Sequence, residues 1–259
     1  MGSVEQHGAI VTKCYARLAG GVGNQLFITA AAYAYSKKYN KELCLDGDNW
    51  VGHQGKPANE YRDTIFKNFI YDSSYLSGTT PILEKRCNYD DPPEIDGSVA
   101  FCGYFQSLKY FEEYKDDFIK ELNLPEVDVS ILNKKNVAFH IRRGDYLTFK
   151  DIYGICGTKY FEDHFKKFED YQINVFTDSP EHVLDEFEKY DFNLIQTSSE
   201  LNDLTLMSKH DSMVCSNSTF SWWASLIGNT KTVIVPDKWF LDGREHEDIY
   251  RPDMIKYEL

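Results

Sequence analysis

Short apolar runs separated by polar or glycine-rich segments recur along the first half of the chain. Residues 10–18 predict a strand, and residues 20–25 a glycine-rich turn that leads into an alanine-rich helix. Apolar runs at 42–45 and 98–102 predict two further strands. Four apolar side chains then follow at helical spacing: Phe111, Tyr114, Phe118 and Leu122. The first half therefore has the pattern of an α/β lobe.

The same alternation resumes after the polar stretch 126–135. Strands are predicted at 137–141, 173–177, 212–215 and 232–235. Helical patterns fill most of the gaps, with Phe161, Phe165 and Phe168 at helical spacing. Alternating strands and helices favour parallel sheets, whose ligands bind at the carboxyl ends of the strands. We expect two such lobes, at 1–128 and 129–259.

Composition and charge restrict the possible partners. The 259 residues are 42% hydrophobic, enough for one large core or two modest ones. A formal charge of -13 disfavours nucleic acid and anionic membranes as partners, so an anionic ligand needs a local basic cluster. The pattern contains no apolar run long enough to span a membrane, and it contains no signal peptide. Both observations predict a soluble, cytoplasmic protein. Six cysteines without a CxxC pair predict buried, reduced thiols.

A basic motif follows the predicted strand at 137–141. Its sequence is His140-Ile141-Arg142-Arg143-Gly144-Asp145. Two guanidiniums at one strand end can hold the oxygens of a diphosphate bidentately. Surface arginines paired with some of the many carboxylates explain the same six residues equally well.

The glycine-rich turn at 20–25 offers a second place for a ligand. Leu26 stands where the dinucleotide-binding fingerprint has its third glycine, so a nicotinamide or flavin site is disfavoured. The turn can still bring a phosphate or sugar close to backbone amides at Gly21, and Asn24 can hydrogen-bond either group. A plain tight turn is the alternative interpretation.

Small polar side chains gather after the predicted strand at 212–215. Residues 216–219 combine hydroxyls with the amides of a helix entrance, which favours anion binding, although an ordinary N-cap has the same composition. Trp222 and Trp223 are predicted to pack in the core. Asp178 follows another strand, where it can accept hydrogen bonds from a ribose or a purine, or simply form a turn.

Asp46-Gly47-Asp48 is a possible metal-binding motif. A DxD sequence after a strand can hold a divalent cation under a diphosphate. A turn is the favoured interpretation because Asp-Gly is common in turns. The charged run 245–248 is likewise expected to be a solvated face.

Four blocks in this order resemble the α-1,2-fucosyltransferases of glycosyltransferase family eleven, especially bacterial and viral members. They are Gly20-Gly21-Val22-Gly23-Asn24-Gln25-Leu26-Phe27, His140-Ile141-Arg142-Arg143-Gly144-Asp145-Tyr146, Phe176-Thr177-Asp178 and Asn217-Ser218-Thr219-Phe220-Ser221-Trp222-Trp223. The resemblance implies a GT-B fold, with two Rossmann-like lobes facing a cleft. It also implies inverting transfer of L-fucose from GDP-L-fucose to a glycan hydroxyl, a galactoside 2-OH, without a metal or a further cofactor.

The resemblance also implies roles for single residues. Arg142 would hold the β-phosphate, and Arg143 would support it or the neighbouring loop. Asn24 would approach from the other lobe. The expected catalytic residues are Arg142, Arg143, Asp145 and Asn24. The expected donor-binding residues are His140, Arg142, Asp178, Ser216, Asn217, Ser218, Thr219 and Gly21. Asp145 is also explained by an ion pair with an arginine, and the sequence identifies no base for the acceptor hydroxyl.

Two other functions remain open from the sequence. A metal-dependent glycosyltransferase would use Asp46 and Asp48 with another nucleotide sugar. A noncatalytic glycan-binding protein would stack Trp222 and Trp223 on sugar faces and leave the arginine pair unexplained.

Overall fold

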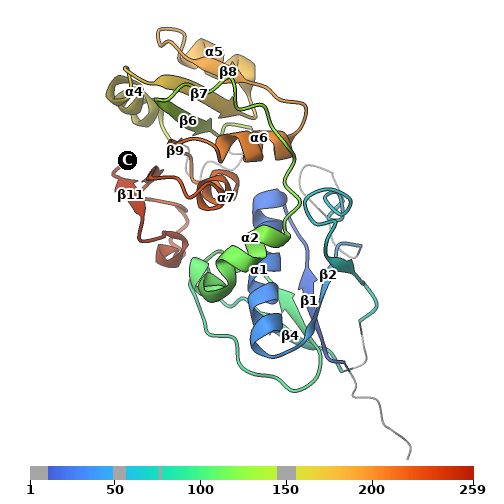
Figure 1. Cartoon of the computed structure of the whole chain (residues 1–259). Helices are drawn as coiled ribbons and strands as arrows, with labels where there is room; N and C mark the ends of the chain where they lie inside the picture. The colour runs from blue at the N-terminus through green and yellow to red at the C-terminus, as the bar shows by residue number, and fades with distance from the viewer. Residues whose placement is uncertain (1–10, 49–56, 76–77, 145–155) are drawn as a thin grey trace, which may run out of the picture.

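The computed structural model describes residues 11–48, 57–75, 78–144 and 156–259, and it contains two parallel β-sheets (Figure 1). The first has the strand order β3-β2-β1-β5-β4. Its strands are β1 (Lys13–Arg17), β2 (Glu42–Asp46), β3 (Ile70–Tyr71), β4 (Thr80–Leu83) and β5 (Val99–Cys102). All of its pairings are parallel, as the alternating pattern predicts.

The second sheet has the order β11-β10-β9-β6-β7-β8, again with parallel pairings. Its strands are β6 (Asn136–Ile141), β7 (Gln172–Thr177), β8 (Asn193–Ile195), β9 (Ser212–Cys215), β10 (Thr232–Pro236) and β11 (Met254–Tyr257). The boundary expected at 128/129 falls between the last strand of the first sheet and the first strand of the second. Each sheet is therefore built from one continuous part of the chain.

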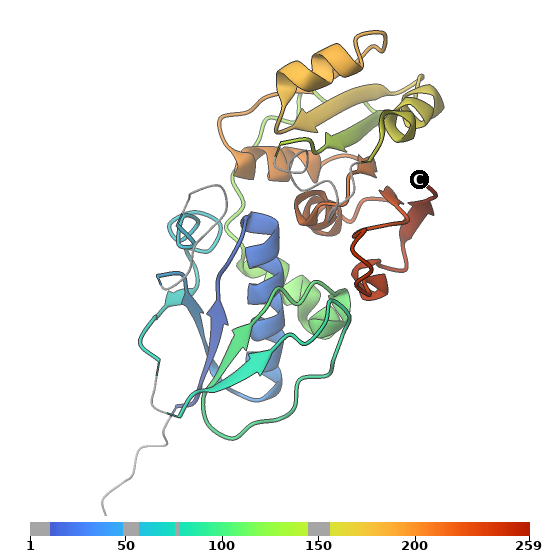
Figure 2. The ribbon, with the colours of Figure 1, turned by 180° about the vertical axis from the view of Figure 1, so that it is seen from behind.

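Helices cover the sheets unevenly. The α-helices are α1 (Val22–Lys38), α2 (Lys115–Glu121), α4 (Thr158–Lys167), α5 (Pro180–Glu186), α6 (Glu200–Met207) and α7 (Thr219–Ile227). Short 3-10 turns lie at η1 (Leu108–Tyr110), η2 (Glu112–Tyr114) and η4 (Glu247–Ile249). Both α1 and α2 lie on one face of the first sheet, and the view from behind shows its strands in front of α1 (Figure 2). Within the described ranges, no helix is both long and apolar enough to cross a bilayer.

The α1 helix is buried along most of its length, from Val22 to Ser36. Its alanines let it pack closely on β1 and on neighbouring helices. The buried hydroxyls of Thr29 and Ser36 donate to carbonyls of their own helix, at 2.8 and 2.7 Å. These bonds satisfy polar groups that would otherwise be costly inside the core.

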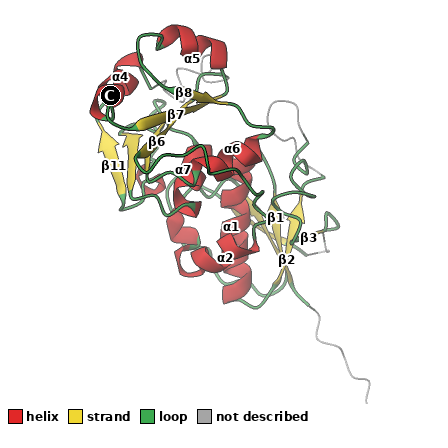
Figure 3. Cartoon of the chain, turned by 45° about the horizontal axis from the view of Figure 1, so that its top comes forward, coloured by secondary structure: helices red, strands yellow, loops and turns green. Residues whose placement is uncertain are grey.

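A seam between α1 and α7 joins the two lobes (Figure 3). The ring of Phe27 on α1 lies 4.4 Å from that of Trp222 and 5.2 Å from that of Trp223, measured between ring centroids. Phe111 stacks on Trp223 at 5.3 Å. The two tryptophans are almost completely buried, which confirms the prediction that they belong to the core.

The central strand β6 separates two apolar clusters by its alternation. Val137, Phe139 and Ile141 pack with the phenylalanines of α4, whereas Ala138 belongs to the large cluster that also contains α1 and α7. That large cluster extends across both lobes. The lobes therefore share much of their core and do not have one modest core each.

All six cysteines are free thiols, as predicted, and four of them are buried. The four strands that the apolar pattern missed, β3, β4, β8 and β11, are the edge strands of the two sheets. Edge strands are short and partly exposed, so their composition is close to that of a loop. The helix α7 begins at Thr219, inside the polar motif, rather than at the apolar residues that follow it.

Candidate active site

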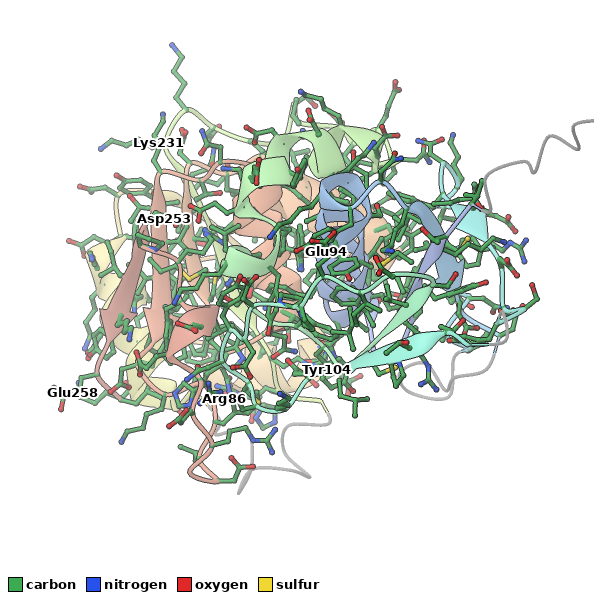
Figure 4. All side chains as sticks on the ribbon, turned by 90° about the horizontal axis from the view of Figure 1, so that it is seen from below. Arg86, Glu94, Tyr104, Lys231, Asp253 and Glu258 are labelled. Atoms are coloured by element: carbon green, nitrogen blue, oxygen red, sulfur yellow. The ribbon has the colours of Figure 1, made fainter. Side chains whose placement is uncertain are left out.

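A cavity of about 310 Å³ lies between the carboxyl ends of the two sheets. From the first lobe it is lined by residues 19–24, Glu84, Cys87, Tyr104 and Gln106. From the second it is lined by Arg142, Glu200, residues 217–220, Trp239, Phe240 and Arg244. In the view from below, Tyr104 lies beside the strand ends of the first sheet, and Arg86 marks the neighbouring loop (Figure 4).

Arg142 brings a guanidinium from the end of β6 to the cavity. Its backbone amide donates to Ser216 Oγ at 3.0 Å, and its Nη1 forms an ion pair with Asp178 Oδ2 at 3.0 Å. The side chain keeps 18% of its surface accessible. These contacts hold a charged, planar donor group in one orientation, which suits recognition of a phosphate.

Arg143 points away from the cavity into the second lobe. Its Nε and Nη2 donate to the two carboxylate oxygens of Glu186 at 3.0 and 2.9 Å, and Nη1 donates to the carbonyls of Arg142 and Cys156. Only 2% of the side chain is exposed. The structure thus differs from the expectation of two guanidiniums on one diphosphate, because adjacent residues of an extended segment point in opposite directions. Arg143 is placed to support the segment that carries Arg142.

Asp178 and His140 lie behind the cavity lining. Asp178 Oδ1 accepts from the Arg143 amide at 2.9 Å while Oδ2 binds Arg142. A side chain at Gly144 would come within 2.1 Å of that Oδ2, so it would displace the Asp178 carboxylate from its present position. The His140 ring is buried and its Nδ1 lies 2.9 Å from Ser221 Oγ. Desolvation, and secondly the charge of Arg142, lowers the pKa of His140 to about 3. Both residues belong to the hydrogen-bonded surroundings of Arg142. Neither lines the cavity, although both were expected to bind the donor.

The polar motif after β9 forms the amino-terminal end of α7. Ser218 is its N-cap and accepts from the Phe220 amide at 3.3 Å. Ser216 is buried. Its hydroxyl donates to the His140 carbonyl and accepts from the Arg142 amide, so both of its hydrogen bonds are to the backbone. Asn217 donates to the Trp239 carbonyl at 2.8 Å. Of the four polar residues expected to bind the donor here, Asn217, Ser218 and Thr219 line the cavity and Ser216 lies beneath it.

The glycine turn and Asn24 face this helix end from the first lobe. Asn24 Oδ1 accepts from Thr219 Oγ1 at 3.0 Å and from Gln106 Nε2 at 2.9 Å. Gly21 is the N-cap of α1, and a side chain at Gly23 would come within 2.6 Å of the Thr219 backbone. The glycine at position 23 therefore allows α1 and α7 to approach. The amino-terminal ends of both helices lie at the cavity, and neither has an acidic residue in its first turn.

The cavity residues that the sequence analysis missed include four with charged or amide side chains: Glu84, Gln106, Glu200 and Arg244. Glu84 follows an edge strand that the apolar pattern did not predict. The Arg244 side chain pairs with Asp242 and lies over the Phe240 ring, 4.6 Å from its centroid. The signal that could have found Glu84 is a charged residue directly after a strand of a parallel sheet.

The charged run 245–248 is only partly a solvated face. Asp248 accepts from Lys109 Nζ at 2.6 Å and from the Tyr89 amide at 2.9 Å. These bonds connect the second lobe with the first. The run therefore contributes to the contact between the lobes.

The remaining candidates lie away from the cavity or outside the described residues. Asp145 belongs to the undescribed segment 145–155. Asp46 is buried and accepts a hydrogen bond from Tyr75, while Asp48 accepts from Asn59 and Ser73. Among the described residues, neither aspartate lines the cavity, and no group of three acidic, histidine or cysteine side chains is arranged to hold a metal. Trp222 and Trp223 are 1% and 0% exposed, so stacking of these rings on a glycan is contradicted.

Two parallel α/β lobes with a cavity between their strand ends form the GT-B architecture. Comparison with solved structures agrees with this architecture. The α-1,6-fucosyltransferase NodZ co-crystallised with GDP superposes with a TM-score of 0.53 at 12% identity, covering 84% of this chain and 92% of NodZ. A structure of NodZ from Bradyrhizobium gives the same TM-score. At this identity the likeness concerns the fold.

The chain belongs to glycosyl transferase family 11, whose model matches residues 96–258. An α-1,2-colitosyltransferase of Escherichia coli is 29% identical over 87% of this chain and 91% of its own length. The O-antigen biosynthesis glycosyltransferase WbnK of Escherichia coli is 24% identical over 87% of this chain and 94% of its length. The resemblance stated from the four sequence blocks is thereby confirmed at the level of the family.

Proposed function

We propose that this glycosyltransferase transfers L-fucose from GDP-L-fucose to a hydroxyl of a glycan acceptor, the 2-OH of a galactoside, with inversion and without a metal. The observation that carries the proposal is the cavity itself. Arg142 and the amino-terminal end of α7 face it from one lobe, and the amino-terminal end of α1 faces it from the other. The diphosphate of a nucleotide sugar is the ligand that this combination of charge and helix ends favours.

The proposed reaction uses Arg142 on the leaving group. As the sugar departs, negative charge builds on the β-phosphate of GDP, and a fixed guanidinium stabilises it more in the transition state than in the ground state. Asp178 and the backbone contact with Ser216 keep that guanidinium in place. Asn217, Ser218, Thr219 and Gly21 are proposed to bind the donor, and Asn24 to fix the glycine turn beside it. Arg143, His140 and Ser216 are proposed to position these groups from behind.

Independence of metal is part of the proposal. Arg142 and the two helix ends supply positive potential where the diphosphate would lie. In metal-dependent glycosyltransferases a divalent cation has this role. Asp46 and Asp48 are engaged elsewhere in the first lobe. This arrangement favours the metal-free reaction over the alternative that uses the DxD motif.

GDP-colitose is a second candidate donor. The relative that is 29% identical is named an α-1,2-colitosyltransferase. Colitose lacks the 3-hydroxyl of L-fucose, so the two donors present the same diphosphate to Arg142 and differ at one position of the sugar. The same α-1,2 linkage is expected with either donor.

The test is GDP release from each donor with a panel of galactoside acceptors, with and without EDTA. Acceptor-dependent release from GDP-L-fucose that survives EDTA, with a 1→2 linkage in the NMR spectrum of the product, is the expected result. Release from GDP-colitose alone would identify GDP-colitose as the donor in place of GDP-L-fucose. Loss of release with EDTA would favour the metal-dependent alternative. GDP binding without release from any donor would favour a protein that binds the nucleotide but does not transfer the sugar.

A further inference from the structure

Glu84 is a carboxylate on the first-lobe side of the cavity, and it lies outside residues 96–258, which the family model matches. It follows β4 directly, at the carboxyl end of that edge strand. It is half-buried and lines the same cavity as Arg142. The two residues come from different lobes, so the cavity brings a first-lobe carboxylate and a second-lobe guanidinium to one site.

The carboxylate is held in one orientation by backbone amides. Oε1 accepts from the Phe105 amide and Oε2 from the Tyr104 amide, both at 2.8 Å. The Gln106 amide also hydrogen-bonds this carboxylate, and the three amides leave one of its four lone-pair sites for a further proton donor. Among the described residues, no ion pair neutralises Glu84.

The turn that holds Glu84 adopts an unusual backbone conformation. Gly103 has φ 149° and passes so close that an added Cβ would lie 2.3 Å from the Glu84 Cβ. Phe105 has φ 53°, in the left-handed region that non-glycine residues seldom occupy. Such conformations cost free energy and persist where the surrounding structure fixes them, which is common at active sites.

Burial makes Glu84 a stronger proton acceptor than an ordinary carboxylate. Burial raises the pKa of its carboxyl above the ordinary value, despite the amide hydrogen bonds that lower it. Its titratable and charged neighbours are Cys87, Tyr110 and Arg244. Burial raises the pKa of the first two, and pairing with Asp242 raises that of Arg244, so all three keep their charge state between pH 5 and 8.

Glu200 is the other carboxylate that the described residues place at the cavity. It belongs to the first turn of α6 in the second lobe and accepts from the Tyr61 hydroxyl at 2.8 Å. Inversion requires the acceptor to attack the face of the sugar opposite to GDP. Because Arg142, the proposed leaving-group contact, also belongs to the second lobe, we assign the base to the carboxylate of the first lobe.

We propose that Glu84 is the general base that accepts the proton of the acceptor hydroxyl, an inference that rests on the proposed function. The acceptor oxygen forms a bond to C1 of the sugar while its proton passes to a Glu84 oxygen. The bond between C1 and the β-phosphate oxygen breaks, and its electron pair leaves with GDP. The proton then exchanges from Glu84 to solvent.

The test compares Glu84→Gln and Glu84→Asp with Asp203→Asn as a matched control. Asp203 is a half-buried carboxylate outside the cavity, it accepts from Thr197 Oγ1 at 2.8 Å, and burial raises its pKa as well. Rates of GDP release at saturating donor and acceptor are measured from pH 4 to 9, together with donor affinity and the urea midpoint at each pH. For Glu84→Gln we expect kcat to fall about 100-fold or more, with donor affinity within about twofold of wild type.

The pH profile separates catalysis from support of the turn. In the wild type, kcat falls as the pH drops through the raised pKa of Glu84, because the protonated base cannot accept a proton. This acidic limb disappears in Glu84→Gln, and it persists in Asp203→Asn and, at a lower rate, in Glu84→Asp.

A kcat for Glu84→Gln within about threefold of an active wild type would overturn the base assignment and leave the proposed function standing. An unchanged acidic limb, with kcat falling only in proportion to a loss of folded protein, would also overturn it. A wild type that transfers neither fucose nor colitose would overturn the proposed function and this inference together.

Discussion

At the scale of single residues, two adjacent arginines have different environments. Arg142 lines the cavity and is held by Asp178, whereas Arg143 is buried and forms a bidentate pair with Glu186. A basic dipeptide thus contributes one side chain to the site and one to the framework that supports it. The difference follows from the alternation of side chains along an extended segment.

Replacing each arginine by alanine separates these roles. Arg142→Ala is expected to lower kcat about 100-fold or more with little change in the urea midpoint, because it removes the proposed contact to the leaving group. Arg143→Ala is expected to cost about 2 kcal/mol of unfolding free energy, because it removes a buried side chain and leaves the half-buried Glu186 with only Thr158 and His182 as partners. Steady-state kinetics and urea unfolding of both variants are the measurements. Equal stability losses in the two variants would contradict the assignment.

At the scale of elements, the ends of α1 and α7 meet at the cavity through a glycine. The ideal Cβ at Gly23 lies 2.6 Å from the Thr219 carbonyl carbon and 2.7 Å from the Phe220 amide nitrogen. Backbone atoms cannot rotate away as a flexible side chain can. The packing of the two helices, and with it the bond between Thr219 and Asn24, therefore depends on this position.

Gly23→Ala is expected to destabilise the protein by about 1–2 kcal/mol, since overpacking outweighs the gain in helix propensity. We also expect a higher KM for the donor, because the two helix ends move apart. Gly157→Ala is the control: Gly157 is the N-cap of α4, and nothing lies within 4 Å of its ideal Cβ. The control should stay within about 0.5 kcal/mol of wild type in urea unfolding, with an unchanged KM. Similar losses in both variants would point to a general effect of alanine.

At the scale of the whole molecule, one apolar cluster extends through both lobes, and buried histidines make its stability depend on pH. Burial lowers the pKa of His140 to about 3 and that of His210 to about 4. His210 Nδ1 contacts the carbonyls of Leu206 and Met207, while Nε2 lies 2.9 Å from the Asn174 amide. A proton on Nε2 would face an amide donor, so the neutral form is favoured.

Stability should fall on mild acidification. The unfolded chain binds protons at histidine near pH 6.5, whereas these folded-state pKa values lie far lower, so unfolding takes up protons between them. Each histidine is expected to remove about 2 kcal/mol between pH 7 and 5. The raised pKa values of Glu84 and Asp203 act in the opposite direction, because these carboxyls bind protons more tightly in the folded protein than in the unfolded chain. Urea unfolding at several pH values measures the slope.

Asn174→Asp offers a matched change, because an aspartate at this position would accept a hydrogen bond from protonated His210. The variant should show a shallower dependence of stability on pH than the wild type. A slope identical to that of the wild type would exclude His210 as a source of the acid sensitivity.

The sequence by itself determined the fold class, the central strands and the family. Central strands of parallel sheets are apolar on both faces, so 137–141 and 212–215 could be recognised, whereas edge strands such as β4 and β11 could not. The four blocks of the family stand close to the strand ends that form the cavity, since local sequence determines turns and helix starts such as Ser218.

Only the tertiary structure decided which residues of those blocks line the cavity and which support it from behind. It turned Arg143 inward, placed His140 and Asp178 behind the cavity lining, and buried Trp222 and Trp223 against Phe27. It also brought Glu84 from an unpredicted edge strand to face Arg142 from the other lobe. Periodicity and composition describe neighbours along the chain. The orientation of a side chain, and its partners from distant segments, depend on how the two sheets pack through α1 and α7.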